Sequence, residues 1–351
     1  MPDLGVLSTA GEAATAELVQ ATPAQQAQRW RLHHATWGDG FDLPLYLQRE
    51  QALAEADFCR DAQRMWLLVD GHGAVLASCE TYTSSAWTGM PGGALRPIRL
   101  ETVASVLVEP RLRNQGFAAR LMHEVRDQLQ FERCAAVSLY SDVGSPLYRR
   151  AGWLLHPARS STRAVAATEA WPTPAGELGI GDVADLLREA STTTSAWLAE
   201  VAAPAMAEVP AAVRIAWFHL RAQYRAWARG QQPAQLVGAV GPDGGCALWS
   251  ADLAEPVLSV LLWRPNGPDD AAALTQAAMA QAAEQGLRRV EWWDADRDTG
   301  LDPYRQPAWQ PTGALARDRD KALPMLCWLG AGMGEGPMPL VWGGVERFGW
   351  G

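Results

Sequence analysis

Residues 99–129 constrain the fold of this chain more than any other stretch, because an apolar strand there runs through a turn into a strongly amphipathic helix. RLETVASVLVEP predicts a mostly buried β-strand that ends at Pro110, since proline has no N–H to donate to a sheet. Apolar residues then recur on one helical face: Ala118, Leu121, Met122, Val125 and Leu129. A strand, a short turn and a helix in this order predict an α/β (α+β) fold.

The turn between this strand and this helix has the pattern R-x-x-G-x-A, formed by Arg113, Gly116 and Ala118. Several backbone N–H groups at such a turn have no helical partner and point the same way at the positive end of the helix dipole, which favours an anion. Gly116 lets a pyrophosphate approach the backbone, Ala118 keeps the next turn uncrowded, and Arg113 adds positive charge. Neither the Walker pattern nor G-x-G-x-x-G is present. Taken alone, the pattern is equally typical of an ordinary β–α loop.

The elements around this turn occur in an order that the second half of the chain repeats. Helices are expected from Thr22-Pro23 onward and over residues 43–56, followed by a hairpin over 64–85 in which Asp70-Gly71 forms the turn. A strand over 135–141 and a short helix ended by Gly152 follow the central helix.

The second half contains helices at about 182–202 and 210–229, a hairpin over 235–252, a strand over 256–265, a helix at about 269–285 and a strand over 288–296. Helix, helix, hairpin, strand, helix, strand thus occurs twice, which indicates a duplicated architecture. We expect one domain over residues 1–168, a linker over 169–180 and a second domain over 181–351.

Composition excludes several classes of protein. No apolar run approaches the roughly 18 residues that cross a bilayer, and the first residues do not resemble a secretory signal, so a cytoplasmic protein is expected. The five scattered cysteines suit neither a zinc site nor a disulfide framework, and no metal is expected. A net charge of −9 without a basic run argues against nucleic acid and favours a cationic substrate.

Two sequence signatures, in order along the chain, resemble those of the GNAT superfamily of acyl-CoA-dependent N-acyltransferases. The first, V-x-V-x-P followed by [QR]-x-x-G-x-[GA], is matched in register by Val106, Val108, Pro110, Arg113, Gly116 and Ala118. The second, N-x-x-A-x-x-x-Y-x-x-x-G-[FW], is matched by Tyr148, Gly152 and Trp153, whereas Ser141 and Gly144 replace the commoner Asn and Ala. The resemblance implies two GNAT-like domains, each a mixed central sheet flanked by helices, with a splayed strand.

The resemblance also implies roles for particular residues. The splayed strand would bind the pantetheine arm of acetyl-CoA through Val106, Leu107 and Val108. The turn would hold the pyrophosphate through Arg113, Asn114, Gln115, Gly116, Phe117, Ala118 and Ala119. Tyr148 would be the general acid that protonates the departing thiolate. A glutamate base would be Glu101, with Glu80 as the alternative, and either could instead bind a cationic substrate. The terminal carboxylate of Gly351 is a further candidate, since some multi-domain relatives place that group in the active site.

Several stretches, among them YLQREQAL and SLYSDVGSPLYRRAGW, narrow the resemblance to the fungal lysine N6-acetyltransferases and their bacterial relatives. The turn of the second half, Arg264-Pro265-Asn266-Gly267-Pro268, departs from the signature, and its prolines cannot donate hydrogen bonds. The second domain is therefore expected to be degenerate and to wall the acceptor pocket. Its available side chains are Trp217, His219, Arg221, Trp292, Trp293, Asp294 and Asp296.

The expected reaction is acetyl transfer from acetyl-CoA to a primary amine of a small cationic substrate, with free lysine as the first candidate, by direct attack in a ternary complex. Aminoglycoside-type antibiotics and protein or peptide amines are the alternative acceptors. A catalytically silent acyl-CoA-binding regulatory module is the alternative of another class. Self-association into a homo-oligomer is compatible with the sequence, and neither nucleic acid nor a membrane is an expected partner.

Overall fold

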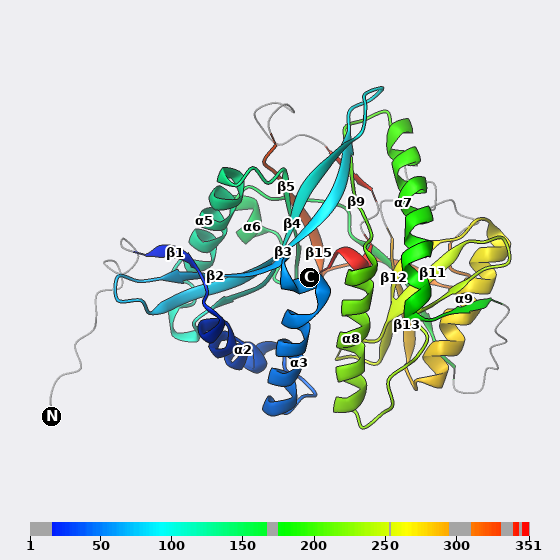
Figure 1. The fold of residues 1–351 in the computed structure, drawn as a ribbon, viewed down its shortest axis with the longest axis horizontal. Coiled ribbons are helices and arrows are strands. Elements are labelled where there is room, and N and C mark those ends of the chain that lie inside the picture. Colours follow the sequence, from blue (N-terminus) through cyan, green and yellow to red (C-terminus); the bar gives the residue numbers. More distant parts are fainter. Residues whose placement is uncertain are drawn as a thin grey trace.

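The computed structural model of the chain contains two β-sheets that lie side by side, each covered by helices (Figure 1). It describes residues 16–166, 175–252, 254–294, 310–330, 340–343 and 346–350. Mixed sheets flanked by helices were predicted, and this part of the fold prediction is confirmed.

The first sheet has the strand order β1-β2-β3-β4-β5-β15-β6, and β9 and β16 extend it beside the distal half of β3. Only β4 and β5 pair in parallel along the main path. The strands span β1 Glu17–Gln20, β2 Gln63–Val69, β3 Val75–Gly89, β4 Arg96–Val108, β5 Ala136–Ser141, β6 Leu154–Leu155, β9 Ala205–Glu208, β15 Leu323–Trp328 and β16 Val341–Gly343.

Apolar side chains of β2 point alternately to the two faces of this sheet, and each face is covered by different helices. Trp66 and Leu68 pack in the cluster that holds the apolar stripe of α5 (Phe117–Phe131). Met65, Leu67 and Val69 point the other way, against α2 (Pro23–Trp37) and α3 (Leu43–Glu55). Short helices α4 (Asp57–Arg60) and α6 (Pro146–Arg150) complete this half.

Most local signals in the first half have the predicted effect. Thr22 caps α2 in a capping box with Gln25, and Pro23 occupies its first turn. The hairpin turn differs in one detail, because Gly73 rather than Gly71 adopts the positive φ, of 80°. Asp70 accepts hydrogen bonds from the backbone N–H groups of His72 and Ala74, and this lengthens the turn beyond a two-residue connection.

The second sheet has the order β14-β7-β13-β12-β11-β10-β8, with α9 against one face and α7 and α8 against the other. Its strands are β7 Arg159–Ala164, β8 Gly176–Leu178, β10 Gly238–Val240, β11 Cys246–Ser250, β12 Val257–Arg264, β13 Arg289–Asp294 and β14 Leu315–Asp318. Its helices are α7 Val183–Glu200, α8 Ala212–Ala228 and α9 Pro268–Glu284. The predicted helices, hairpin and strands of this half are present, whereas β8, β9, β14, β15 and β16 were not predicted.

The two sheets exchange strands. β7 follows β6 in sequence but pairs with β13 and β14 in the second sheet. β15 lies late in the chain but pairs with β5 and β6 in the first sheet. The sheets are thus interleaved across the boundary expected at residues 169–180, of which residues 169–174 lie outside the described residues. The division of the chain into domains remains a prediction.

The turn of the second half is closed by one buried carboxylate. Asp270, on the first turn of α9, is 0% exposed and accepts hydrogen bonds from the backbone N–H groups of Asp243, Gly245 and Asn266 at 2.6–2.9 Å. The N–H of Asn266 belongs to the turn between β12 and α9, which is the counterpart of the turn before α5. A side chain of the protein therefore takes the place of an external anion here.

Replacing Asp270 with alanine is expected to destabilise the protein by about 3 to 5 kcal/mol, because the buried N–H of Gly245 and the part-buried N–H groups of Asp243 and Asn266 lose their acceptor together. Chemical denaturation measures the free energy of unfolding. Asp269→Ala is the matched control, because this neighbouring carboxylate is exposed. Equal stability of the two variants would contradict the assignment.

Candidate active site

The first feature of the site is a splay between β4 and β5. These parallel strands pair from Leu100 with Ala136 to Val103 with Leu139, and no pair follows, although β4 continues to Val108 and β5 to Ser141. The backbone of β4 beyond Val103, which includes Val106, Leu107 and Val108, thus has no strand partner on the β5 side. An extended ligand can form hydrogen bonds with such an edge.

A bulge in β4 coincides with the start of the splay. Between the pairs Ser78 with Leu107 and Glu80 with Ala104, β4 has one residue more than β3. Ser105 takes up this extra residue with a φ of 53°, an unusual value for a residue with a side chain. Strained backbone of this kind is common at functional sites.

The turn before α5 is shaped as a concave group of N–H donors. Asn114 and Gly116 both adopt left-handed backbone conformations, with φ of 63° and 88°, and no side chain caps the helix N-terminus. Residues 113–116 are exposed, and nothing lies within 4 Å of the place where a Cβ of Gly116 would be. Phe117 is buried in the core and anchors the turn, while Ala118 and Ala119 lie half-buried on the first helical turn. These features fit a pyrophosphate.

Tyr148 is held where β5 leaves the sheet. Ser141, at the end of β5, donates to the carbonyl of Gly144 at 2.6 Å and so shapes the loop that leads into α6. Tyr148 is 6% exposed, and burial raises the pKa of its phenol to about 12, helped by Cys79 and Asp142. Its hydroxyl makes no hydrogen bond to the described residues. A phenol that stays protonated and unengaged can donate a proton to a ligand.

Glu101 lies in an ion-pair network on the α5 side of the sheet. Its carboxylate is 0% exposed, and its Oε1 accepts hydrogen bonds from Arg99, at 2.5 Å, and from Thr83, at 2.7 Å. Arg64 lies 3.3 Å from the same oxygen, and Glu132 joins both arginines. This oxygen is thus bound to two arginines and a threonine, which makes Glu101 a poorer candidate than Glu80 to accept a proton from a substrate. The geometry favours the alternative, Glu80.

Glu80 lies on the opposite side of the sheet, beside the bulge. Its carboxyl group is 3% exposed and accepts hydrogen bonds from Gln63 and Tyr82, each at 3.2 Å. Burial raises its pKa, and hydrogen bonds from Ser105 and Tyr82 partly offset this effect. A carboxylate with a raised pKa next to the splay is a suitable proton acceptor.

A cluster of charged and aromatic side chains surrounds Glu80, and the sequence did not indicate most of it. Glu50 on α3 forms an ion pair with Arg49, and burial raises the pKa of Glu50. Glu50 also helps to raise the pKa of Tyr46 above its usual range. The one signal in the sequence that could have indicated this cluster is the position of Glu50 on the same face of α3 as Tyr46 and Arg49.

Helix α8 covers this cluster from the second half. Trp217 contacts Phe58 and Tyr82, with ring centroids 5.6 and 5.7 Å apart. Arg221 lies over the rings of Trp217 and Trp350 and is 3.1 Å from a carboxylate oxygen of Asp252. The second half therefore closes the side of the first sheet on which Glu80 lies.

The other side chains expected to wall the acceptor pocket are dispersed. Trp292 is buried in the core of the second sheet, and Trp293 packs against Tyr140 and beneath Arg319. His219 lines a separate cavity of the second half. Asp296, the side chain of Asp294, and Gly351 lie outside the described residues, so their roles remain predictions.

Within the described ranges, no group of histidine, cysteine or acidic side chains is arranged to hold a metal ion. None of the helices that the structure describes is long and apolar enough to span a bilayer.

The fold, with its splayed pair of strands, is that of the GNAT superfamily. Two solved structures have the same fold: a GCN5-related N-acetyltransferase from Kribbella flavida, with a TM-score of 0.52, and a conserved protein of unknown function and probable N-acyltransferase from Enterococcus faecalis V583, with a TM-score of 0.53. Their sequences are 17% and 12% identical to that of this chain. Each alignment includes 90% of this chain, and it includes 72% of the first structure and 73% of the second. No curated protein matches the chain.

Residues 160–351 match the family model described as the LYC1 GNAT-like C-terminal domain. The match spans more than half of the chain, which therefore belongs to this family. It begins at β7, the strand that the first half contributes to the second sheet. The predicted membership of the GNAT superfamily is confirmed.

Proposed function

We propose that the protein transfers acetyl from acetyl-CoA to a primary amine of a small cationic substrate, by direct attack in a ternary complex. The observation that carries the proposal is the meeting of three features at one point of the first sheet. These features are the splay after Val103, the uncapped left-handed turn at Gly116, and the unengaged phenol of Tyr148. The splayed strand would bind the pantetheine arm and the turn would bind the pyrophosphate.

Glu80 and Tyr148 would move the protons of the reaction. The alkylammonium gives one proton to Glu80, and the freed nitrogen attacks the thioester carbonyl. The carbon–sulfur bond breaks as the carbon–nitrogen bond is completed, and the thiolate takes the proton of Tyr148. The nitrogen then loses its second proton, which restores the phenol through solvent. Glu101 has a structural role in this scheme.

The charges around Glu80 support a cationic acceptor. Burial raises the pKa of Glu50, and the nearby Glu80 carboxylate raises it further, so the two groups lie close enough to interact. An alkylammonium bound at Glu80 would offset the repulsion between the two carboxylates. The cover provided by Trp217 and Arg221 suits a compact molecule, of which free lysine is our first choice. Aminoglycosides and protein or peptide amines need a more open site and are the alternatives. The location in the cytoplasm and self-association remain predictions.

A thiol-release assay tests the proposal. Acetyl-CoA is offered with free amino acids, polyamines, aminoglycosides and peptides, and lysine is expected to give the highest kcat/KM. If lysine were inert while another amine turned over, free lysine would be excluded and the proposed acetyl transfer would stand. Binding of acetyl-CoA by calorimetry without thiol release from any amine would show the silent regulatory module instead.

Gly116→Val is expected to raise the KM for acetyl-CoA at least about tenfold, because a β-branched residue disfavours a φ of 88° and obstructs the approach of the pyrophosphate. Gly73→Val is the matched control. Its φ is 80° and its surroundings are equally open, but it lies in the hairpin between β2 and β3. If both variants had the same KM, the turn would not be the pyrophosphate site.

A further inference from the structure

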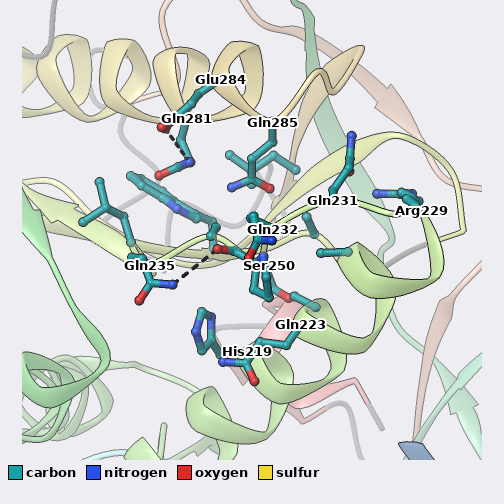
Figure 2. Close-up of a pocket in the computed structure, with 18 residues that line it drawn as sticks. His219, Gln223, Arg229, Gln231, Gln232, Gln235, Ser250, Gln281, Glu284 and Gln285 are labelled. Carbon is teal, nitrogen blue, oxygen red and sulfur yellow. Dashed lines mark hydrogen bonds between the residues drawn. The ribbon is translucent and has the colours of Figure 1, made fainter. Parts of the chain in front are cut away.

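The second half of the chain contains a cavity that the proposed reaction does not use. It encloses about 440 Å³, within the range of small-ligand sites. Figure 2 shows His219 and Gln223 extending into it from α8, Gln281 and Glu284 from α9, and Gln232 and Gln235 from the segment after α8. All of its lining residues lie between positions 219 and 285, so no element of the first sheet contributes.

Helix α8 separates this cavity from the cluster around Glu80. Two residues of α8 face the first sheet. Trp217 packs against Tyr82, and Arg221 interacts with the carboxyl group of Glu80. The cavity is lined by His219 and by the residues three, four and seven positions after it, which are Ala222, Gln223 and Ala226. The helical period thus places the two sites on different faces of one helix.

The lining is rich in neutral hydrogen-bonding groups. Six glutamines contribute to it: Gln223, Gln231, Gln232, Gln235, Gln281 and Gln285. The amides of Gln223, Gln231, Gln232 and Gln285 form no hydrogen bond with any residue that the structure describes. Each amide can donate and accept, so these groups suit a ligand that does both.

The few charged groups at the cavity are engaged with the protein. Glu284 accepts a hydrogen bond of 3.0 Å from Gln281, and Arg229 donates to the carbonyls of Ala254 and Glu255. Burial lowers the pKa of His219, so its imidazole is neutral near pH 7. An anionic ligand would lose its hydration close to the Glu284 carboxylate.

We infer that this cavity binds a small uncharged molecule that carries hydroxyl or carboxamide groups, at a site distinct from that of acetyl transfer. The amides of α8 and of the following segment hydrogen-bond its polar groups, and the aliphatic side chains of Leu236 and Leu258 contact its carbon skeleton. The ligand class follows from a lining that offers many neutral donors and acceptors and a carboxylate, Glu284, that disfavours an anion.

Matched neutral and anionic probes test this inference on the full chain. Glucose is compared with glucuronate and nicotinamide with nicotinate, by calorimetry and saturation-transfer NMR. At least one neutral probe is expected to bind at millimolar or lower concentration, with its anionic counterpart about tenfold weaker. Ala226→Phe fills the cavity and should abolish binding. Val213→Phe, on the exposed face of α8, should leave binding unchanged.

Gln232→Ala provides a second variant that should fold normally, because this side chain is exposed, and it should weaken binding severalfold. Equal binding of neutral and anionic probes would overturn the inference. So would binding that survives Ala226→Phe, displacement of the probe by acetyl-CoA, or no binding of either neutral probe at about 10 mM. None of these readouts requires turnover, so the result is independent of whether the proposed reaction is correct.

Discussion

A Tyr148→Phe variant is expected to lower kcat about a hundredfold while the KM for acetyl-CoA changes little, because the substitution removes only the proton donor and keeps the buried ring. The raised pKa of Tyr148, about 12, keeps the phenol protonated throughout the working range. Loss of activity at high pH is therefore not expected from this group. On the acid side, activity should rise with pH as Glu80, whose pKa burial raises, loses its proton. Steady-state kinetics of thiol release across pH measures both effects.

Tyr224→Phe is the matched control for this experiment. Tyr224 is also 6% exposed, but it packs against Trp227 on α8 and in a cluster with Phe41 and Tyr46, not in the cluster that holds Tyr148. Its replacement should leave kcat unchanged. If Tyr148→Phe behaved like Tyr224→Phe, another group or water would have to protonate the thiolate.

A fragment of residues 1–168 is expected not to fold, although it contains the turn, Tyr148 and Glu80. Without β15 it loses the six residue pairs that join this strand to β5. It also loses Met325, Leu326 and Cys327, which are almost fully buried. Burial of each such side chain contributes about 1.5 to 3 kcal/mol, and the summed loss approaches the total stability of a typical domain.

Circular dichroism and thermal unfolding of the fragment measure this effect. A cooperative transition in the isolated fragment would contradict the expectation. Co-expression with residues 169–351 should restore a folded complex, because that part carries β15. A fragment that stays unfolded even then would show that the covalent connection is itself required.

Local chemistry made much of the fold and the turn predictable. The capping of α2 by Thr22, the apolar stripe of α5 and the end of the β4 strand at Val108 each depend on residues close in sequence. The exchange of β7 and β15 does not, because the pattern of a short strand such as LPMLCW is equally compatible with either sheet. Which sheet such a strand joins depends on which sheet edge has no partner in the folded chain.

The proton acceptor was ambiguous for a similar reason. Glu101 and Glu80 are both acidic residues on neighbouring strands, and no spacing rule distinguishes them. Arg64, which is 37 residues from Glu101 in sequence, helps to neutralise that carboxylate. The bulge at Ser105 then changes the register beside Glu80. In the proposed reaction, long-range pairing and one extra residue in β4 thus distinguish Glu101 from the candidate base Glu80.

The position of β15 has a consequence for synthesis of the protein on the ribosome. β5 and β6 emerge early, but the strand that lies between them emerges only when Leu323–Trp328 has been translated. At ordinary elongation rates this delay is on the order of ten to thirty seconds. During that interval the edge of β5 is open to other chains, so newly made protein should depend on chaperones until the late strand arrives.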